Sequence, residues 1–276
     1  MKNAPLVSAS WLSSKLEDPE VIVLDATLAK PKSTGIIPHQ TKQIPGARYF
    51  DIDHAFSDKS IQLPHMMCDT EQFEKEAQRL GINNDSSVVV YDSHGVYSSP
   101  RAWWMLRSMG LSQVFVLNGG LPEWIDKRYR VEERIKKPHV TGNFSPSFNT
   151  SCFVDKNFVL NHMNDKDILV IDARSKGLGT EPEPRDGLRS GHIPSSISLP
   201  FTEVIEGYQM KAKDDLNKIL DPLNLEEKKI VFTCGSGLTA CIILLAANIV
   251  GCDDLTVYDG SWSEWGQSTE LPVETS

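Results

Sequence analysis

The sequence predicts an α/β protein with two tandem domains, each a mainly parallel sheet flanked by helices. Three observations predict this fold class. Short apolar runs alternate with helical segments, the runs recur in the same order in the two halves, and one strand in each half leads through a small-residue loop into a helix. Two copies are too few for a solenoid, so the repetition indicates a duplicated domain.

The duplication rests on four pairs of matching segments, whose spacing drifts by a few residues along the chain. Such drift is typical of loops that changed length after a duplication. The pairs are Val21–Thr27 with Ile168–Arg174, Ile44–Ala47 with Ile193–Ser196, Val88–Gly95 with Ile230–Gly237, and Gly119–Trp124 with Asp259–Trp265.

In the first half, the segment Pro100–Met109 is expected to be a helix. Ser98 is a plausible N-cap and Pro100 a plausible first-turn residue. The stretch 132–150 carries Lys-Lys-Pro and Ser-Pro with little periodicity, which is typical of a linker. We therefore expect an N-terminal domain over residues 5–131, a linker over 132–150 and a C-terminal domain over 151–272.

In the second half, four apolar runs are expected to be strands and one long apolar segment a helix. A strand, a buried helix and a further strand form a crossover unit with parallel strands. The helix is apolar all round, so we expect it to be covered on most sides. The strands are Ile168–Asp172, Ile197–Leu199, Ile230–Thr233 and Leu255–Tyr258, and the helix is Thr239–Val250.

Cys234 is the main candidate for chemistry, because it ends a strand and opens Gly235-Ser236-Gly237 just before that helix. Unpaired backbone N–H groups and the positive end of a helix dipole both favour a thiolate. We expect this thiol at an open mouth of the C-terminal half. The structural alternative is a small residue at the end of a core strand.

The position that matches Cys234 in the first half is Asp92, and a carboxylate cannot carry sulfur. One half therefore holds the chemistry, and the other supplies scaffold and could supply one wall of a cleft.

The sequence lacks the residues that several other classes of enzyme require. A cysteine-dependent phosphatase needs an arginine six positions after the cysteine, where this chain has Ala240. No Gly-x-Ser-x-Gly, GxGxxG, phosphate-binding Gly-Lys-Ser/Thr or HExxH pattern is present. We expect neither a cofactor nor a metal.

Composition limits the partners and the compartment. The net charge of −9 argues against nucleic acid or an anionic membrane as a main partner. Five cysteines without paired spacing suggest neither a disulfide framework nor a zinc site. Because no signal core or membrane-length apolar stretch is seen, we expect a cytoplasmic protein.

The duplicated halves carry four motifs that together resemble the two-domain rhodanese (sulfurtransferase) family. Within that family, Cys-Gly-Ser-Gly followed by an aliphatic residue and threonine is similar to the loop of 3-mercaptopyruvate sulfurtransferases. The resemblance covers about residues 5 to 272. The motifs are Asp172–Arg174, Gly191–Pro194, Cys234–Thr239 and Tyr258–Trp265.

The resemblance implies an activity. The Cys234 thiolate takes a sulfur atom from 3-mercaptopyruvate, releases pyruvate and passes the sulfur from its persulfide to a thiol or cyanide acceptor. The acceptor would be thioredoxin or a small thiol. Two alternatives stay open: a thiosulfate:cyanide sulfurtransferase, and a non-enzymatic module that relays sulfur to a protein partner.

The resemblance also implies roles for individual residues. Backbone amides from Gly235 to Thr239 would stabilise the charge on the persulfide or its thiolate, and Gly235, Gly237, Leu238 and Thr239 would contact the substrate. Ser236 would act on the pyruvate enolate, with Asp53 and His65 of the first half approaching it. Arg185 matches a substrate-binding arginine, and Lys176 stands where the family has a second one.

From the residues alone, several of these side chains have simpler roles. His65 is a loop histidine, and Asp53 is a strand-end or capping carboxylate. Arg174 pairs with a nearby carboxylate or carbonyl, and Glu181 and Glu183 are solvated charges. Four tryptophans are expected to pack in the core: Trp103, Trp104, Trp124 and Trp265. Cys241 is expected to be a packed small residue. Cys68 and Cys152 could be exposed redox sites, but the sequence gives them no activating neighbours.

Overall fold

The computed structural model describes residues 4–28, 41–134, 140–175 and 183–275. The chain forms two compact units. Unit 1 comprises Met1–Lys59, Met67–Asn149 and Gly207–Met210, and unit 2 comprises Ser60–Met66, Thr150–Glu206 and Lys211–Ser276. Each unit thus takes in a short segment from the other half of the chain. Unit 1 also includes nearly all of the stretch suggested as a linker.

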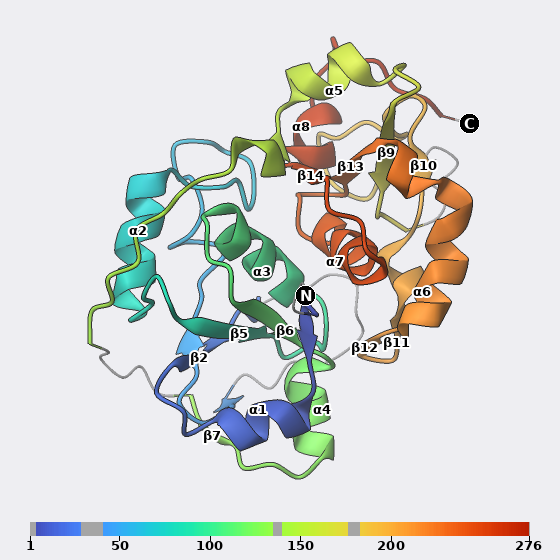
Figure 1. The fold of residues 1–276 in the computed structure, drawn as a ribbon. Helices are drawn as coiled ribbons and strands as arrows, with labels where there is room; N and C mark the ends of the chain where they lie inside the picture. Colours follow the sequence, from blue (N-terminus) through green and yellow to red (C-terminus); the bar gives the residue numbers. More distant parts are fainter. Residues whose placement is uncertain (1–3, 29–40, 135–139, 176–182, 276) are drawn as a thin grey trace. The chain divides into compact units, whose positions relative to one another are not determined.

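Unit 1 is built on a five-stranded parallel sheet in the order β1-β6-β5-β2-β4. Helix α3 lies on one side of this sheet, and α1 and α4 lie on the other (Figure 1). The apolar runs form the central strands because both faces are covered. The strands are β1 (Leu6–Val7), β2 (Val21–Asp25), β4 (Arg48–Tyr49), β5 (Ser87–Tyr91) and β6 (Val114–Leu117), and the helices are α1 (Ala9–Lys15), α2 (Thr70–Arg79), α3 (Ser99–Ser108) and α4 (Gly120–Asp126).

Unit 2 repeats this arrangement with strand order β10-β9-β13-β14-β8, again all parallel. Helices α6 and α7 lie on one side of the sheet, and α5 and α8 lie on the other (Figure 1). The strands are β8 (Phe153–Val154), β9 (Ile168–Asp172), β10 (Ile197–Ser198), β13 (Lys229–Thr233) and β14 (Leu255–Tyr258), and the helices are α5 (Lys156–His162), α6 (Lys213–Leu220), α7 (Ala240–Val250) and α8 (Ser261–Trp265).

Short elements complete the chain. Strands β3 (Lys42–Gln43) and β7 (Glu132–Glu133) pair antiparallel within unit 1. The others are β11 (Ile205–Glu206), β12 (Gln209–Met210) and 3₁₀ turns at Thr150–Cys152, Phe201–Val204, Asp221–Leu223 and Leu225–Glu227.

The second-half elements follow the prediction to within one residue at each end. Helix α7 is buried from Ala240 to Ala247, as its all-round apolar sequence predicts. Trp103, Trp124 and Trp265 are at most 1% exposed and lie in the cores, which confirms their packing role.

The start of α3 differs from the prediction in one respect. Pro100 does lie in the first turn, but the hydroxyl of Ser98 donates to the carbonyl of Ala26 at 2.7 Å and does not cap the helix. The amides that begin the helix are bonded instead by the Asp92 carboxylate. Ser98 is the N-cap residue, as predicted, but its side chain does not bond the helix amides, because the buried Asp92 carboxylate takes that place.

The sequence left an exposed redox role open for Cys68 and Cys152, although it gives them no activating neighbours. Cys68 and Cys152 are buried, so neither is an exposed redox site. Burial raises the pKa of the Cys68 thiol to about 12, with the charge of Asp69 adding to the effect. Cys241 is fully buried in α7, as expected.

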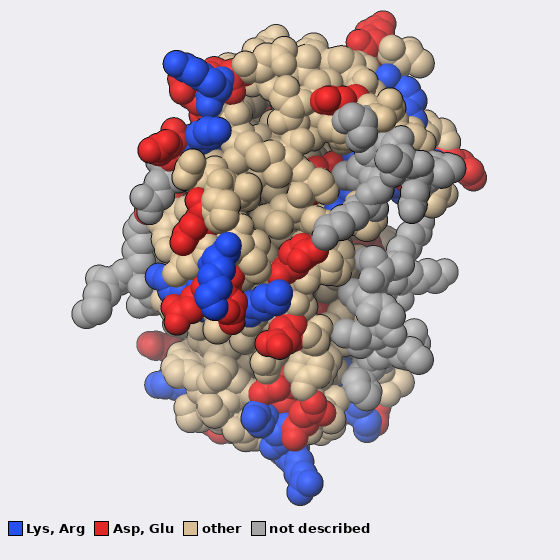
Figure 2. All heavy atoms as spheres, turned by 90° about the vertical axis from the view of Figure 1, so that its right-hand side faces the viewer, with Lys and Arg blue, Asp and Glu red and all other residues tan. Residues whose placement is uncertain are grey.

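No helix within the described ranges is long and apolar enough to cross a lipid bilayer. On the face drawn in Figure 2, acidic and basic side chains are interspersed, without a continuous basic area among the described residues.

Candidate active site

Cys234 follows the last residue of β13, where the backbone is held by the first turn of α8. Ser261 Oγ accepts from the Cys234 amide at 3.2 Å, and the Trp262 amide donates to the Cys234 carbonyl at 3.0 Å. The residue is only 1% exposed. The thiol is therefore buried in this structure and, contrary to expectation, does not lie open to solvent at the mouth of the C-terminal half.

The carbonyl of Gly235 accepts hydrogen bonds from three donors. They are the Ser263 hydroxyl at 2.6 Å, the Ser263 amide at 2.9 Å and Arg185 Nη1 at 3.2 Å. An added Cβ at Gly235 would lie 3.0 Å from that guanidinium nitrogen, so glycine allows the close approach of Arg185.

Arg185 is held by Glu183, which lies between two arginines. Arg185 Nε lies 2.7 Å from Glu183, and Arg174 Nη1 lies 3.5 Å from it. Burial acts to raise the pKa of the Glu183 carboxyl, but the hydrogen bonds and charge of Arg185, with the charge of Arg174, lower it overall. The expectation of a solvated Glu183 was wrong, because its side chain is only 7% exposed.

Arg174 has the structural role that the sequence predicts. It bonds Asp172 at 2.7 Å, donates to the Gly191 carbonyl at 2.9 Å and stacks over the Trp262 ring at 4.2 Å. Lys176 and Glu181 lie outside the described residues.

Ser236 is bonded to His65, 171 positions away in the sequence. Their Oγ and Nδ1 atoms are 2.9 Å apart, and the segment Ser60–Met66 that carries His65 belongs to unit 2. His65 has a left-handed φ of 62°, which turns the chain back at this point. Asp53 belongs to unit 1, where its backbone carbonyl accepts from Lys59 and its charge helps burial raise the pKa of Tyr49 to about 12.

The rest of the loop leads directly into α7. Gly237 has a φ of +72°, Leu238 is buried and Thr239 immediately precedes the helix. Within the described part of the chain, the amides of Ser236, Thr239 and Ala240 donate to no hydrogen-bond acceptor. Such amides at the start of a helix form a site for an anion.

The matching loop of unit 1 holds an anion of its own. Asp92 Oδ1 accepts from the His94 amide at 2.9 Å, and Oδ2 accepts from the amides of Tyr97, Ser98 and Ser99 at 2.9 to 3.0 Å. The Ser99 hydroxyl adds a further bond at 2.7 Å. By the duplication, His94 corresponds to Ser236 and Tyr97 to Thr239. We call the two loops the cysteine loop (Cys234–Thr239) and the aspartate loop (Asp92–Tyr97).

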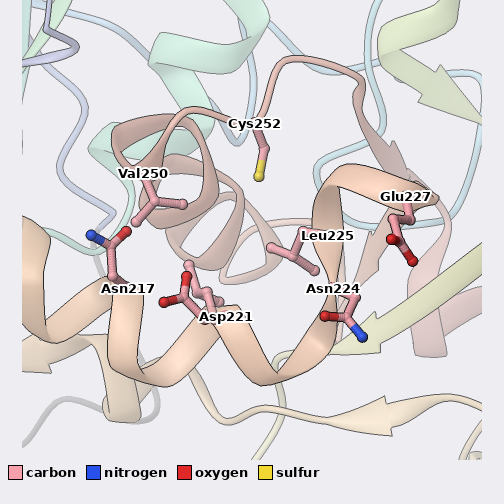
Figure 3. Close-up of a pocket in the computed structure, with 8 residues that line it drawn as sticks. Asn217, Asp221, Asn224, Leu225, Glu227, Val250 and Cys252 are labelled. Carbon is pink, nitrogen blue, oxygen red and sulfur yellow. The ribbon is translucent and has the colours of Figure 1, made fainter.

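A separate cavity of about 380 Å³ lies between α6 and the end of α7 (Figure 3). Cys252 points its sulfur toward this cavity, which otherwise has mainly polar walls from Asn217, Asp221 and Asn224. None of the residues predicted for the site lines it. The described residues contain no group of three or more His, Cys, Asp or Glu side chains that could hold a metal ion.

Fold and site together define a duplicated α/β protein in which one of two equivalent anion-binding loops carries a cysteine. Rhodanese-like domains match residues 8–127 and 155–268, and the chain belongs to the rhodanese family. A 3-mercaptopyruvate sulfurtransferase of Escherichia coli (strain K12) is 38% identical over 281 residues, with 99% of each chain covered. A thiosulfate sulfurtransferase of Mus musculus is 35% identical, with 98% of this chain and 94% of the relative covered.

The crystal structure of SseA from Escherichia coli matches with a TM-score of 0.83 at 35% identity, covering 94% of this chain and 99% of that one. The predicted fold class, family and enzyme class, a sulfurtransferase, are confirmed by these comparisons. A sulfurtransferase needs a sulfur donor and an acceptor.

Sequence reasoning missed Ser263 and the true role of Glu183. Ser263 lies within a motif used to recognise the duplication, and its counterpart in the first half is Pro122. That difference between otherwise matching motifs was a usable signal.

Proposed function

We propose that the protein moves sulfur from 3-mercaptopyruvate through a persulfide on Cys234 to a thiol or cyanide acceptor. The Cys234 thiolate attacks the donor sulfur, an S–S bond forms and the C–S bond breaks. The leaving pyruvate enolate takes up the proton lost by the donor thiol and leaves as pyruvate.

The observation that carries this proposal is the Asp92 carboxylate in the aspartate loop. Its charged oxygens lie two bonds beyond Cβ, as the terminal sulfur of a cysteine persulfide does. In unit 1 that position is bonded by four backbone amides. Because the cysteine loop has the same sequence position and precedes a matching helix, its amides suit an anionic terminal sulfur on Cys234.

Donor choice follows from the groups near the loop. A 3-mercaptopyruvate molecule presents a carboxylate, which suits the guanidinium of Arg185, and Lys176 is proposed as a second cation. Ser236 and His65 are proposed to stabilise and protonate the enolate, a need that thiosulfate does not create. The relatives support both donors, since one is named for each.

The role of Asp53 stays a prediction. We propose thioredoxin or a small thiol as the acceptor. A thiolate that attacks the terminal sulfur returns Cys234 to its starting state. The proposed domains are 5–131, 132–150 and 151–272, with the cytoplasm as the compartment.

The test compares donors and follows the sulfur. The protein is incubated with 3-mercaptopyruvate or thiosulfate at equal concentrations, pyruvate or sulfite is measured, and the Cys234 peptide is weighed by mass spectrometry. We expect faster turnover with 3-mercaptopyruvate, a gain of one sulfur atom on Cys234, and no turnover by Cys234→Ser. Preference for thiosulfate would favour the second donor, and a persulfide discharged only to a protein would favour a relay module.

A further inference from the structure

The carbonyl of Gly235 is the most heavily bonded acceptor in the cysteine loop. It accepts from the Ser263 hydroxyl, the Ser263 amide and Arg185 at 2.6, 2.9 and 3.2 Å. Ser263 is 7% exposed and also accepts from Arg185 at 3.4 Å. A carbonyl oxygen has two lone pairs, so three donors hold it firmly and polarise the whole peptide group.

Because a peptide group is planar, fixing the Gly235 carbonyl also fixes the direction of the Ser236 N–H. In a trans peptide the N–H points opposite to the C=O, and the described chain has no cis peptide. With the Gly235 carbonyl held toward Ser263 and Arg185, the Ser236 N–H is turned to the other side of the loop. Polarisation of the carbonyl also makes this N–H a stronger donor.

The aspartate loop shows which group the matching N–H bonds, whereas the Ser236 N–H itself has no acceptor among the described residues. The amide of His94, the counterpart of Ser236, donates to the side chain of Asp92 at 2.9 Å. The corresponding target in the cysteine loop is the Cys234 side chain. The two loops are attached to α4 and α8 in the same way, because the Leu121 amide donates to the Asp92 carbonyl and the Trp262 amide to the Cys234 carbonyl, each at 3.0 Å.

The aspartate loop lacks the hydrogen bonds that Ser263 makes to the Gly235 carbonyl in the cysteine loop. Pro122 stands at the position of Ser263, in the third position of α4 as Ser263 is in α8. Proline has neither an N–H nor a hydroxyl, so it can supply neither of the donors that Ser263 supplies. The fold is retained in unit 1 without these bonds. Their presence only in the half with the cysteine indicates a role in the chemistry of the sulfur.

We propose that Ser263 is a positioning residue for sulfur transfer. It holds the Gly235 carbonyl so that the Ser236 amide stays available to stabilise an anionic sulfur on Cys234. This inference rests on the proposed function, in which Cys234 carries the sulfur.

The experiment uses a graded series at one position in the full chain. Ser263→Ala removes the hydroxyl, Ser263→Pro removes the hydroxyl and the amide donor, and Ser263→Thr keeps both. Ser268→Ala is the matched control, because its hydroxyl bonds the Glu270 amide at 3.3 Å outside the loop. Two quantities are measured: the pH profile of Cys234 alkylation by iodoacetamide, followed on its peptide, and the single-turnover rate of persulfide formation.

For Ser263→Ala we expect the thiol pKa to rise by about 0.5–1 pH unit and persulfide formation to slow by about 3- to 10-fold. Ser263→Pro should change both quantities further, and Ser263→Thr and Ser268→Ala should match the unaltered protein. An unchanged alkylation profile in Ser263→Ala would overturn the inference, even if the rate fell, because the residue would then act on donor binding or folding. Sulfur transfer by Cys234→Ser would instead defeat the proposed function.

Discussion

The Nδ1 atom of His65 lies 2.9 Å from the hydroxyl of Ser236, although 171 positions separate the two residues. The segment Ser60–Met66 brings this imidazole to unit 2, next to the loop that begins with Cys234. A hydroxyl bonded to an imidazole can exchange a proton with a leaving group, which cysteine alone cannot do well.

If this pair serves the enolate, its loss should depend on the donor. Ser236→Ala and His65→Gln are expected to lower kcat with 3-mercaptopyruvate by about 10- to 100-fold, with a smaller effect on thiosulfate. The double variant should lose little more than either single one, because the residues act as a unit. Steady-state rates with both donors measure this. His54→Gln is the control, since that side chain is 75% exposed, and equal losses for both donors would contradict the role.

Removing the carboxylate of the aspartate loop should destabilise the protein strongly. Asp92→Ala would leave the buried amides of Tyr97, Ser98 and Ser99 without their acceptor. We expect the free energy of unfolding to fall by about 2–4 kcal/mol, measured by urea unfolding. Asp69→Ala, which removes an ordinary exposed cap of α2, should cost about 1 kcal/mol. Equal costs would show that the buried amides find other partners.

Arg174 should contribute to stability more than its single charge suggests. Arg174→Ala would strand the buried Asp172 and Glu183 carboxylates and remove the contact with Trp262. We expect a loss of about 3–5 kcal/mol in the free energy of unfolding. Arg174→Lys should recover only part of it, since an ammonium cannot bond Asp172 bidentately and also stack. Lys218→Ala breaks an exposed pair with Asp215 and should have no measurable effect.

The Glu183 carboxylate should make stability depend on pH in the acid range. Because its pKa is lowered from 4.5 in the folded state, the stabilisation is present above that value and is lost as the pH falls through the lower folded pKa. Glu183→Gln should therefore melt below the unaltered protein at pH 7, and the difference in Tm should close below about pH 4. Thermal melts from pH 3 to pH 8 test this. A difference that stays constant with pH would assign the loss to packing.

Much of the fold could be predicted because its signals are local. The strands Ile168–Asp172 and Leu255–Tyr258 are apolar runs between turn residues, and α7 is a long apolar segment after a glycine-rich loop. The duplication adds the second unit, since matching runs fold alike. Cys234 stood out for the same reason, as a thiol between a strand and a helix.

The contacts around the site could not be predicted, because serine, glutamate and proline are common at surface turns. Nothing local distinguishes Ser263 from a solvated serine or Glu183 from a solvated glutamate. Their roles depend on Gly235, Arg174 and Arg185, which reach them through the packing of β9, β13 and α8.

The sequence by itself determined two α/β repeats and one cysteine-bearing loop, because periodicity and glycine placement act over a few residues. Its resemblance to the rhodanese family implied sulfur transfer. Only the tertiary structure decided that Cys234 is buried, that the Asp92 carboxylate bonds the amides of its own loop, and that the Ser263 hydroxyl donates to the Gly235 carbonyl. Hydrogen-bond partners of buried groups are chosen by which distant segments the sheet brings together, and that choice is made by packing.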